Sequence, residues 1–235
     1  MRMIKFYIVK ILLKRYREMK KIFSLILSLA MLLTITSGLN LTAYADSSQY
    51  GNIYYEEKED GTIEITGCTS SATSINIPST IVGKTVTSIR NCAFYGCKSL
   101  TSVTIPNSIT SIGREAFYDC TSLTSISIPH SVTSIDNYAF YGTSLINLSI
   151  PASVASIGEG AFNGCKSLAN VTIGNNDSAE KRSTEIGNSA FSECTSLSSV
   201  TIGNNVTSIG AAAFSDCSSL TSVTIPNSVT SIEYG

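Results

Sequence analysis

The sequence has no tryptophan, a single histidine and little charge, and each shortage restricts what the chain can do. Only 14% of the 235 residues are Asp, Glu, Lys or Arg. The lone histidine, His130, follows Pro129, and we interpret it as an exposed loop side chain. A glycine-rich phosphate loop, paired carboxylates on one element and a cysteine–histidine cluster are all missing from the sequence. We therefore predict no enzymatic activity, no cofactor and no metal site.

The sequence also lacks a long apolar run. The most apolar stretch, residues 22–33, follows Lys20 and Lys21 and precedes Ala43-Tyr44-Ala45. This order of a basic, an apolar and a small-residue segment is typical of a secretory signal peptide. We predict that residues 1–45 are such a peptide, cleaved after Ala45. A membrane anchor is the alternative, although the apolar run is short for a membrane span.

Residues 1–18 form an additional basic and apolar segment before a second methionine, Met19. They are either a long basic region of the signal peptide or the product of a start site placed too early. Without residues 1–45 the chain keeps 8 of its 16 basic and 16 of its 17 acidic residues, a net charge of about −8. An acidic surface disfavours nucleic acid and anionic membranes as partners. We expect a secreted or cell-surface protein with no stable membrane span after cleavage.

What the sequence has in abundance is repetition. The stretch from Cys97 to Asp119 is repeated with a similar sequence from Cys120, Cys165, Cys194 and Cys217 onward. An Ala-Phe pair marks each copy, and the phenylalanines follow one another at intervals of 23, 23, 22, 29 and 23 residues. A unit repeated at a spacing of 20–50 residues indicates a solenoid. The six phenylalanines are Phe94, Phe117, Phe140, Phe162, Phe191 and Phe214.

Each repeat contains one clear strand pattern. Val103 and Ile105 alternate with polar residues, which predicts a strand with one buried face. Pro106 then ends the strand, because proline cannot donate a ladder hydrogen bond. We expect the remaining apolar residues to point inward from a turning coil and the coils to stack cooperatively at about 4.8 Å. The predicted strands span 73–78, 101–105, 124–128, 146–150, 169–173, 198–202 and 221–225.

The pattern Leu-x-x-Val-x-Ile-Pro-x-x-Ile-x-x-Ile-Gly-x-x-Ala-Phe-x-x-Cys resembles the BspA-type leucine-rich repeat of bacterial surface proteins. The resemblance covers the chain from about Cys68 to its end. It implies a β-rich leucine-rich-repeat solenoid, with a parallel sheet on one face and short helical or 3-10 turns and loops on the other. It also implies adhesion, with host matrix proteins or other cells as partners.

These patterns divide the chain after the signal into a cap and a repeat domain. Asp60-Gly61 separates two strand-like runs, so we predict an N-terminal hairpin cap at 46–67. We interpret the acidic run Glu56–Asp60 as a solvated turn, with a cation site as the alternative. The leucine-rich-repeat domain then covers 68–235 in about seven coils. It stops at Gly235 in the middle of a repeat, and we expect it to be truncated there.

Five of the seven cysteines occupy one repeat position, and small thiols pack well in a buried column. We interpret them as a reduced structural column, broken at 141–145, where the repeat lacks its cysteine. Isolated disulfides between neighbours are the first alternative, because adjacent members could reach disulfide distance. A metal site is the second alternative. The column residues are Cys97, Cys120, Cys165, Cys194 and Cys217.

Three features are candidates for binding a partner. Tyr95, Tyr118 and Tyr141 follow successive phenylalanines and should stack as a ladder, which either binds or merely shields the next coil. The insertion Asp177–Ser183 either carries a contact or is a tolerated loop. A polar strip on the outward strand positions either binds or keeps the sheet soluble. The charged candidates in the insertion are Asp177, Glu180, Lys181 and Arg182.

These observations support a non-enzymatic module that binds an extracellular protein or glycan. The alternative is a structural spacer that presents another domain, missing from this sequence.

Overall fold

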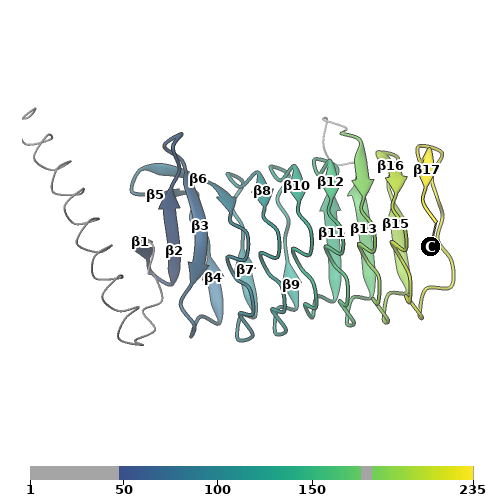
Figure 1. Cartoon of the computed structure of the whole chain (residues 1–235), viewed down its shortest axis with the longest axis horizontal. Helices are drawn as coiled ribbons and strands as arrows, with labels where there is room; N and C mark the ends of the chain where they lie inside the picture. The colour runs from purple at the N-terminus through teal and green to yellow at the C-terminus, as the bar shows by residue number, and fades with distance from the viewer. Residues whose placement is uncertain (1–47, 176–181, 235) are drawn as a thin grey trace, which may run out of the picture. The chain divides into compact units, whose positions relative to one another are not determined.

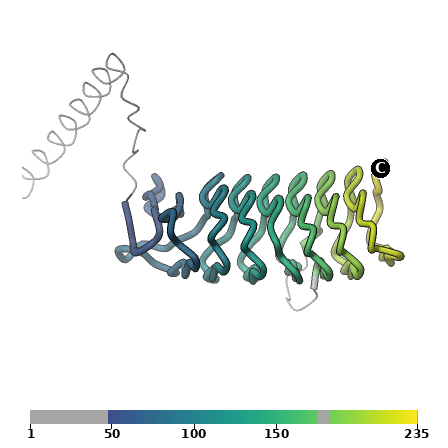
Figure 2. Tube along the Cα trace, turned by 90° about the horizontal axis from the view of Figure 1, so that it is seen from below, coloured from purple at the N-terminus to yellow at the C-terminus, as the bar shows by residue number. Residues whose placement is uncertain are grey.

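The structure, a computed structural model, describes residues 48–175 and 182–234, all within one compact unit, Asp46–Gly235. The predicted signal peptide, 1–45, lies outside these residues. The unit is a solenoid whose coils follow one another side by side along one axis (Figures 1 and 2). The predicted fold class, a β-rich leucine-rich-repeat solenoid, is confirmed.

One wall of the solenoid is a long sheet that the sequence analysis did not predict. After an antiparallel start, its strands are parallel and in register, so that Ser88, Ser111, Ser134 and Ser156 are neighbours. The two-residue strand β5 (Thr80–Ile81) pairs antiparallel with β6. The sheet order is β1 (Ser48–Tyr50), β2 (Ile53–Glu57), β3 (Ile63–Cys68), β6 (Lys84–Ile89), β8 (Ser111–Ile112), β10 (Ser134–Ile135), β12 (Ser156–Ile157), β14 (Thr184–Ile186), β16 (Val206–Ile209) and β17 (Ser231–Ile232).

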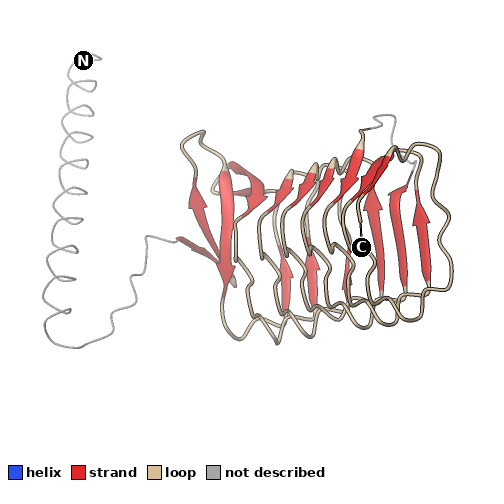
Figure 3. Cartoon of the chain, turned by 45° about the vertical axis from the view of Figure 1, so that its right-hand side comes forward, coloured by secondary structure: helices blue, strands red, loops and turns tan. Residues whose placement is uncertain are grey.

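The opposite wall contains the strands that the alternating pattern predicts, arranged in two short parallel sheets (Figure 3). The two sheets meet at the 22-residue coil, where one residue is deleted. The predicted strand at 221–225 is wrong: that segment forms no strand, and Val223 and Ile225 stay 39% and 37% exposed. It therefore lacks the apolar burial that holds the others in register. The two sheets are β4 (Ser74–Asn76), β7 (Ser102–Thr104) and β9 (Ser125–Ile126), and β11 (Asn147–Pro151), β13 (Asn170–Asn175) and β15 (Ser199–Ile202).

The Ala-Phe segments add a third row of hydrogen bonds between coils. The Phe117 N–H donates to the Ala139 carbonyl at 2.7 Å, and the Phe140 N–H donates to Ala161 at 2.7 Å. These segments are turns, with neither α- nor 3-10 helix anywhere in the described residues, so the expected helical turns are absent there. Most coils are thus tied to the next along three separate lines.

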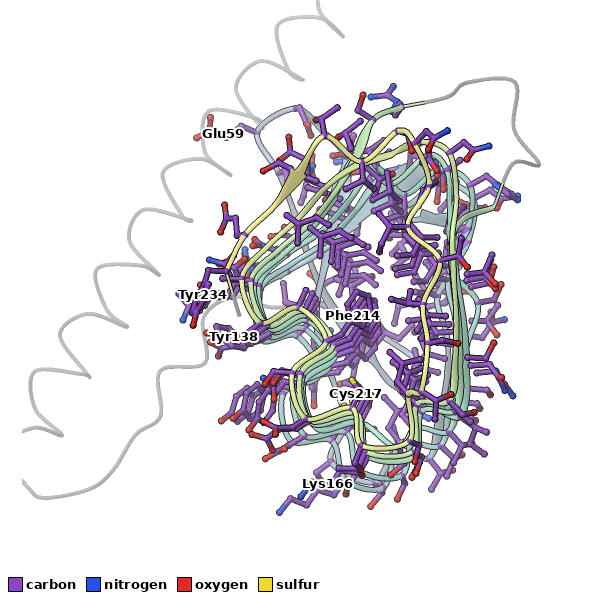
Figure 4. All side chains as sticks on the ribbon, turned by 90° about the vertical axis from the view of Figure 1, so that its right-hand side faces the viewer. Glu59, Tyr138, Lys166, Phe214, Cys217 and Tyr234 are labelled. Atoms are coloured by element: carbon purple, nitrogen blue, oxygen red, sulfur yellow. The ribbon has the colours of Figure 1, made fainter. Side chains whose placement is uncertain are left out.

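The core is a file of phenyl rings between the two walls. Phe94 and Phe117 are stacked with their centroids 4.9 Å apart, and the spacing grows only to 5.4 Å between Phe191 and Phe214. The coils superpose when viewed down the axis, with Phe214 in the middle of the interior (Figure 4). The expected in-register stacking of the phenylalanines is therefore present along the whole file.

Charged side chains tie the hairpin at the start of the solenoid to the next coil. β2 and β3 pair antiparallel across the Asp60-Gly61 turn, as the sequence suggests. β3 also pairs in parallel with β6, so it is the first rung of the long sheet as well as a hairpin strand. Arg90 at the end of β6 donates to Glu56 at 2.9 and 2.5 Å and to Glu64 at 2.7 Å.

Candidate functional site

A groove runs along the long sheet. It has a volume of about 820 Å³ and crosses β3, β6, β8, β10 and β12. Three buried isoleucines, Ile89, Ile112 and Ile135, contribute to its floor. Its lining is otherwise polar: Glu64, Arg90, Asn91, Ser111, Ser134, Asp136, Asn137 and Ser156, with Gly113 and Gly158 between them.

The groove is hollow because glycine and asparagine alternate along its flank. The Asn91 side-chain oxygen accepts the Arg114 N–H at 2.9 Å, and a Cβ on Gly113 would lie 2.6 Å from that same oxygen. The same arrangement returns two coils further on. The Asn137 side-chain oxygen accepts the Glu159 N–H at 2.9 Å, and a Cβ on Gly158 would lie 2.6 Å from that oxygen. A Cβ at either glycine would also meet backbone of the preceding coil, at 2.7 Å from the Asn91 nitrogen and 2.5 Å from the Asn137 nitrogen, so these positions require glycine and carry no side chain to fill the space.

The groove contains both signs of charge. At its hairpin end, the Arg90 guanidinium lies between the carboxylates of Glu56 and Glu64. These hydrogen bonds raise the pKa of Arg90 above its ordinary value and keep it charged. The Ser88 hydroxyl donates to Glu64 at 3.2 Å, so that carboxylate is held from two sides. Asp136 contributes a second negative charge further along. Such a surface suits a ligand that offers several hydroxyl or amide groups.

The three tyrosines of the sequence hypothesis stack as a ladder. Tyr95 and Tyr118 have centroids 4.9 Å apart and Tyr118 and Tyr141 4.5 Å apart, with planes within 5° and 8° of parallel. Because the rings cover one another's faces, the ladder presents ring edges and hydroxyls to a partner. Tyr95, 52% exposed, is the end of the ladder. A binding role for these residues stays a prediction.

Tyr138 extends this aromatic surface, and the sequence analysis missed it. Its ring meets Tyr141 edge-on at 6.3 Å and its hydroxyl donates to Glu159 at 2.6 Å. That hydrogen bond raises the pKa of Tyr138. No other coil has an aromatic residue at this position, so periodicity contained no signal for it.

The insertion is described only at its end. Asp177, Glu180 and Lys181 lie outside the described residues, whereas Arg182 is described and exposed. The following Thr184 is buried, donates to the Val154 carbonyl at 2.6 Å and accepts a hydrogen bond from the Asn205 amide at 2.8 Å. This clamp fixes where the insertion rejoins the solenoid, and a binding role for the insertion stays a prediction.

Four of the column cysteines are buried against the phenylalanine file. Cys120, Cys165, Cys194 and Cys217 each donate a hydrogen bond from sulfur to a phenylalanine carbonyl of the preceding coil, at 3.0–3.3 Å. Burial raises the pKa of Cys165 to about 11 and that of Cys120 to about 12, so both thiols are protonated at neutral pH.

The expected break in the column is filled by another residue. Thr143 lies three residues after Phe140, as Cys120 lies after Phe117, and its hydroxyl donates to the Phe140 carbonyl at 3.0 Å. The same hydroxyl lies 3.2 Å from the Cys165 sulfur. The deletion therefore falls after this position, and threonine substitutes for cysteine as a small hydrogen-bonding group.

The acidic turn after β2, predicted above as an alternative cation site, has its Asp60 paired within the turn. The turn after β2 closes on itself: Asp60 accepts the Thr62 N–H at 2.9 Å and pairs with Lys58 at 3.6 Å. Residues 48–175 and 182–234 contain no cluster of three or more His, Cys, Asp or Glu side chains that could hold a metal ion. Over those same residues, no helix has the length and apolarity needed to cross a membrane.

The geometry of stacked Ala-Phe coils matches a known repeat. A profile of the BspA-type leucine-rich repeat region matches residues 66–181 and 176–235, in six copies. The chain belongs to this family. Leucine-rich repeat domains are generally non-enzymatic and generally mediate protein binding. This BspA-type chain is thus a repeat module of the binding or surface kind.

One solved structure gives the same assignment of fold, and two others are similar to the chain. The leucine-rich repeat protein of T. pallidum is 26% identical, with a TM-score of 0.55 over 74% of this chain and 91% of that one. A leucine-rich repeat protein from Bacteroides ovatus is 25% identical, with a TM-score of 0.47 over 80% of this chain and 61% of that one. A leucine rich cell surface protein from Faecalibacterium prausnitzii is 22% identical, with a TM-score of 0.36 over 82% and 86%. No curated protein is significantly similar to the chain.

Proposed function

We propose that this chain is a secreted or cell-surface binding module that recognises an extracellular glycan or protein segment in the groove of its long sheet. The observation that carries the proposal is the groove itself, about 820 Å³ and lined by polar side chains from several successive coils. A ligand laid along it meets a similar set of groups at every rung, about 4.8 Å apart. Repetition of this kind favours an extended ligand over a compact one.

The chemistry of the lining supports a polar ligand. Hydroxyls of Ser111, Ser134 and Ser156 follow one another on neighbouring strands, between Glu64 and Arg90 at one end and Asp136 on the flank. Aromatic anchors, which are frequent in tight protein interfaces, are not among the lining residues. Weak contacts repeated along the rod would add through multivalency.

A binding assay with one blocking substitution tests this proposal. The purified exported chain is screened on glycan arrays and on extracellular matrix proteins, and each positive ligand is then titrated against Ser134→Arg. Arginine at this position fills the groove, so we expect at least about tenfold weaker binding. Ser149→Arg is the matched control, since it places the same residue on an exposed strand position of the opposite wall.

The outcomes separate the candidate surfaces. Equal binding by Ser134→Arg and the original chain contradicts the groove as the site. If only Ser149→Arg weakens binding, the binding site is the polar strip of the short sheets. If only Tyr95→Ala weakens binding, the binding site is the tyrosine ladder.

A spacer is the second candidate, favoured by the three rows of hydrogen bonds that tie each coil to the next. Such a rod would hold a separate domain at a fixed distance. Removing one whole coil, residues 117–139, shortens the rod by one rung. If the rod is a spacer, the deletion should lower the activity of the domain that it presents. If the groove is a binding site, the deletion should weaken binding of the ligand.

A further inference from the structure

Two half-buried cysteines bring their sulfur atoms into contact at the start of the solenoid. The sulfurs of Cys68 and Cys97 lie 3.4 Å apart, although 29 residues separate them in the chain. Cys68 ends β3 in the first coil and Cys97 lies in the next coil. Both side chains are half-buried, so small thiol reagents can reach them.

The local sequence explains why this pair is different. The other column cysteines donate to the carbonyl of a phenylalanine one coil earlier. The first coil contains no Ala-Phe pair, because Ile65-Thr66-Gly67-Cys68 runs directly from strand to cysteine. Cys97 therefore has no phenylalanine carbonyl before it, and the Cys68 sulfur occupies that place.

We propose that Cys68 and Cys97 are a disulfide site, closed in an oxidising compartment, that fastens the first coil to the second. A disulfide needs its two sulfurs about 2.05 Å apart, and the sulfurs of Cys68 and Cys97 already lie within 3.4 Å of each other. Side-chain rotation then has to bring the two sulfurs only a little closer than they already are. Cys97 then no longer belongs to the predicted reduced column, which keeps Cys120, Cys165, Cys194 and Cys217.

The reaction needs a disulfide-bearing oxidant, such as oxidised glutathione or an oxidised dithiol protein. The Cys97 thiolate attacks one sulfur of the oxidant, forming a mixed disulfide and releasing one thiolate. The Cys68 thiolate then attacks the Cys97 sulfur, which breaks the mixed disulfide and releases the second thiolate. The two cysteine protons end on the two released thiolates, and the oxidant is reduced by two electrons. The hydrogen bond between the two sulfurs lowers the pKa of Cys97 below its ordinary value, which favours Cys97 as the attacking thiol.

The bond would act on the end of the candidate groove. β3 carries Glu64, which lines the groove and accepts hydrogen bonds from Ser88 and Arg90. Cys68 is the last residue of that strand. Closing the bond would hold β3 against the second coil and so limit opening of the solenoid from its hairpin end.

Peptide mapping gives a direct test. The exported Cys92→Ser chain is equilibrated with oxidised glutathione, alkylated without reductant, unfolded and cut with trypsin. Cleavage after Lys58, Lys84, Arg90 and Lys98 then leaves Cys68 alone in peptide 59–84 and Cys97 alone in peptide 91–98. We expect these two peptides to be linked, with a mass two hydrogens below their sum. Complete alkylation of both, or a link from either to another cysteine, would overturn the proposal.

A thermal measurement tests the consequence. Oxidised Cys92→Ser should melt about 6 °C or more above its reduced form, because a closed loop of 29 residues restricts the unfolded chain. The control Cys92→Ser/Cys97→Ser should melt at one temperature in both conditions. Cys92→Ser/Cys165→Ser, which removes a column cysteine instead, should keep the redox difference. An equal redox shift in the Cys97→Ser control would contradict the assignment of this pair.

Discussion

At the scale of single residues, glycine determines how closely two coils can approach. Gly113 lies against the preceding coil: a Cβ there would be 2.7 Å from the Asn91 backbone nitrogen and 2.8 Å from the Arg90 carbonyl carbon. Gly96 is a glycine for a different reason, since its φ of 65° is left-handed but nothing lies within 4 Å of an added Cβ. Gly113 is therefore required by the close packing of two coils, whereas Gly96 is required only by its left-handed backbone conformation.

Gly113→Ala should therefore destabilise the fold far more than Gly96→Ala. We expect a loss of about 3 kcal/mol or more from the clash with rigid backbone, against about 1 kcal/mol from left-handed strain. Chemical denaturation of both variants measures the difference in the free energy of unfolding. Adding Asn91→Ala to Gly113→Ala should not restore stability, because the clashing atoms include backbone. Equal losses at the two glycines would contradict this account of coil packing.

The reactivity of Cys97 gives a second prediction at this scale. In the reduced chain the hydrogen bond with Cys68 lowers the pKa of Cys97 below its ordinary value. Since only the thiolate reacts, alkylation of Cys97 should rise with pH and level off above a midpoint lower than that of an ordinary thiol. Cys68→Ala removes the hydrogen-bond partner, so the midpoint should move up toward the ordinary thiol value. Mass mapping of iodoacetamide adducts across pH measures both, and an unchanged midpoint in Cys68→Ala would contradict the assigned cause.

At the scale of elements, the side chain of Arg90 adds ion pairs between the hairpin and the second coil, beside the backbone pairing of β3 with β6. Arg90 bridges Glu56 on β2 and Glu64 on β3, with three hydrogen bonds of 2.5–2.9 Å. The arginine side chain is 41% exposed, so solvent and salt screen these ion pairs. Their contribution is accordingly modest and depends on ionic strength.

Arg90→Gln should destabilise the hairpin by about 1 kcal/mol at low salt and by less at high salt. Hydrogen exchange of the β2 and β3 amides, followed at two salt concentrations, measures this local loss. Arg114→Gln is the control, because Arg114 contacts only the adjacent Glu115 and is 58% exposed. Faster exchange spread evenly over all coils, or the same effect from Arg114→Gln, would show that Arg90 does not act on the hairpin.

Strands could be predicted from the sequence only where the alternation of apolar and polar residues extends over several positions. Alternation around Val103 and Ile105 predicted the strands of the short sheets, because one buried face repeats every second residue. The rungs of the long sheet are mostly Ser-Ile pairs such as Ser111–Ile112. Two residues contain no alternation, so this sheet and the groove on it could not be foreseen. Each groove residue is an ordinary serine or asparagine whose position matters only after stacking.

At the scale of the whole molecule, stability should be shared along the phenylalanine file. Phe140 is fully buried between Phe117 and Phe162, whereas Phe214 is only partly buried and has a ring neighbour on one side. Because each coil depends on its neighbours, damage in the middle affects both directions along the solenoid.

Phe140→Ala should lower the free energy of unfolding by about 3–5 kcal/mol. Phe214→Ala should cost clearly less, since its cavity is open to solvent. Denaturant titration followed by circular dichroism measures both. Equal costs would mean that the coils fold independently of their position.

The most direct test of the stacking is a crystal structure of residues 46–235. The account predicts six phenylalanine rings, Phe94 to Phe214, in a single buried file with successive centroids about 5 Å apart, 4.9–5.4 Å in the present structure. A structure in which any two successive rings leave the file, or in which the rings point to solvent, would contradict it.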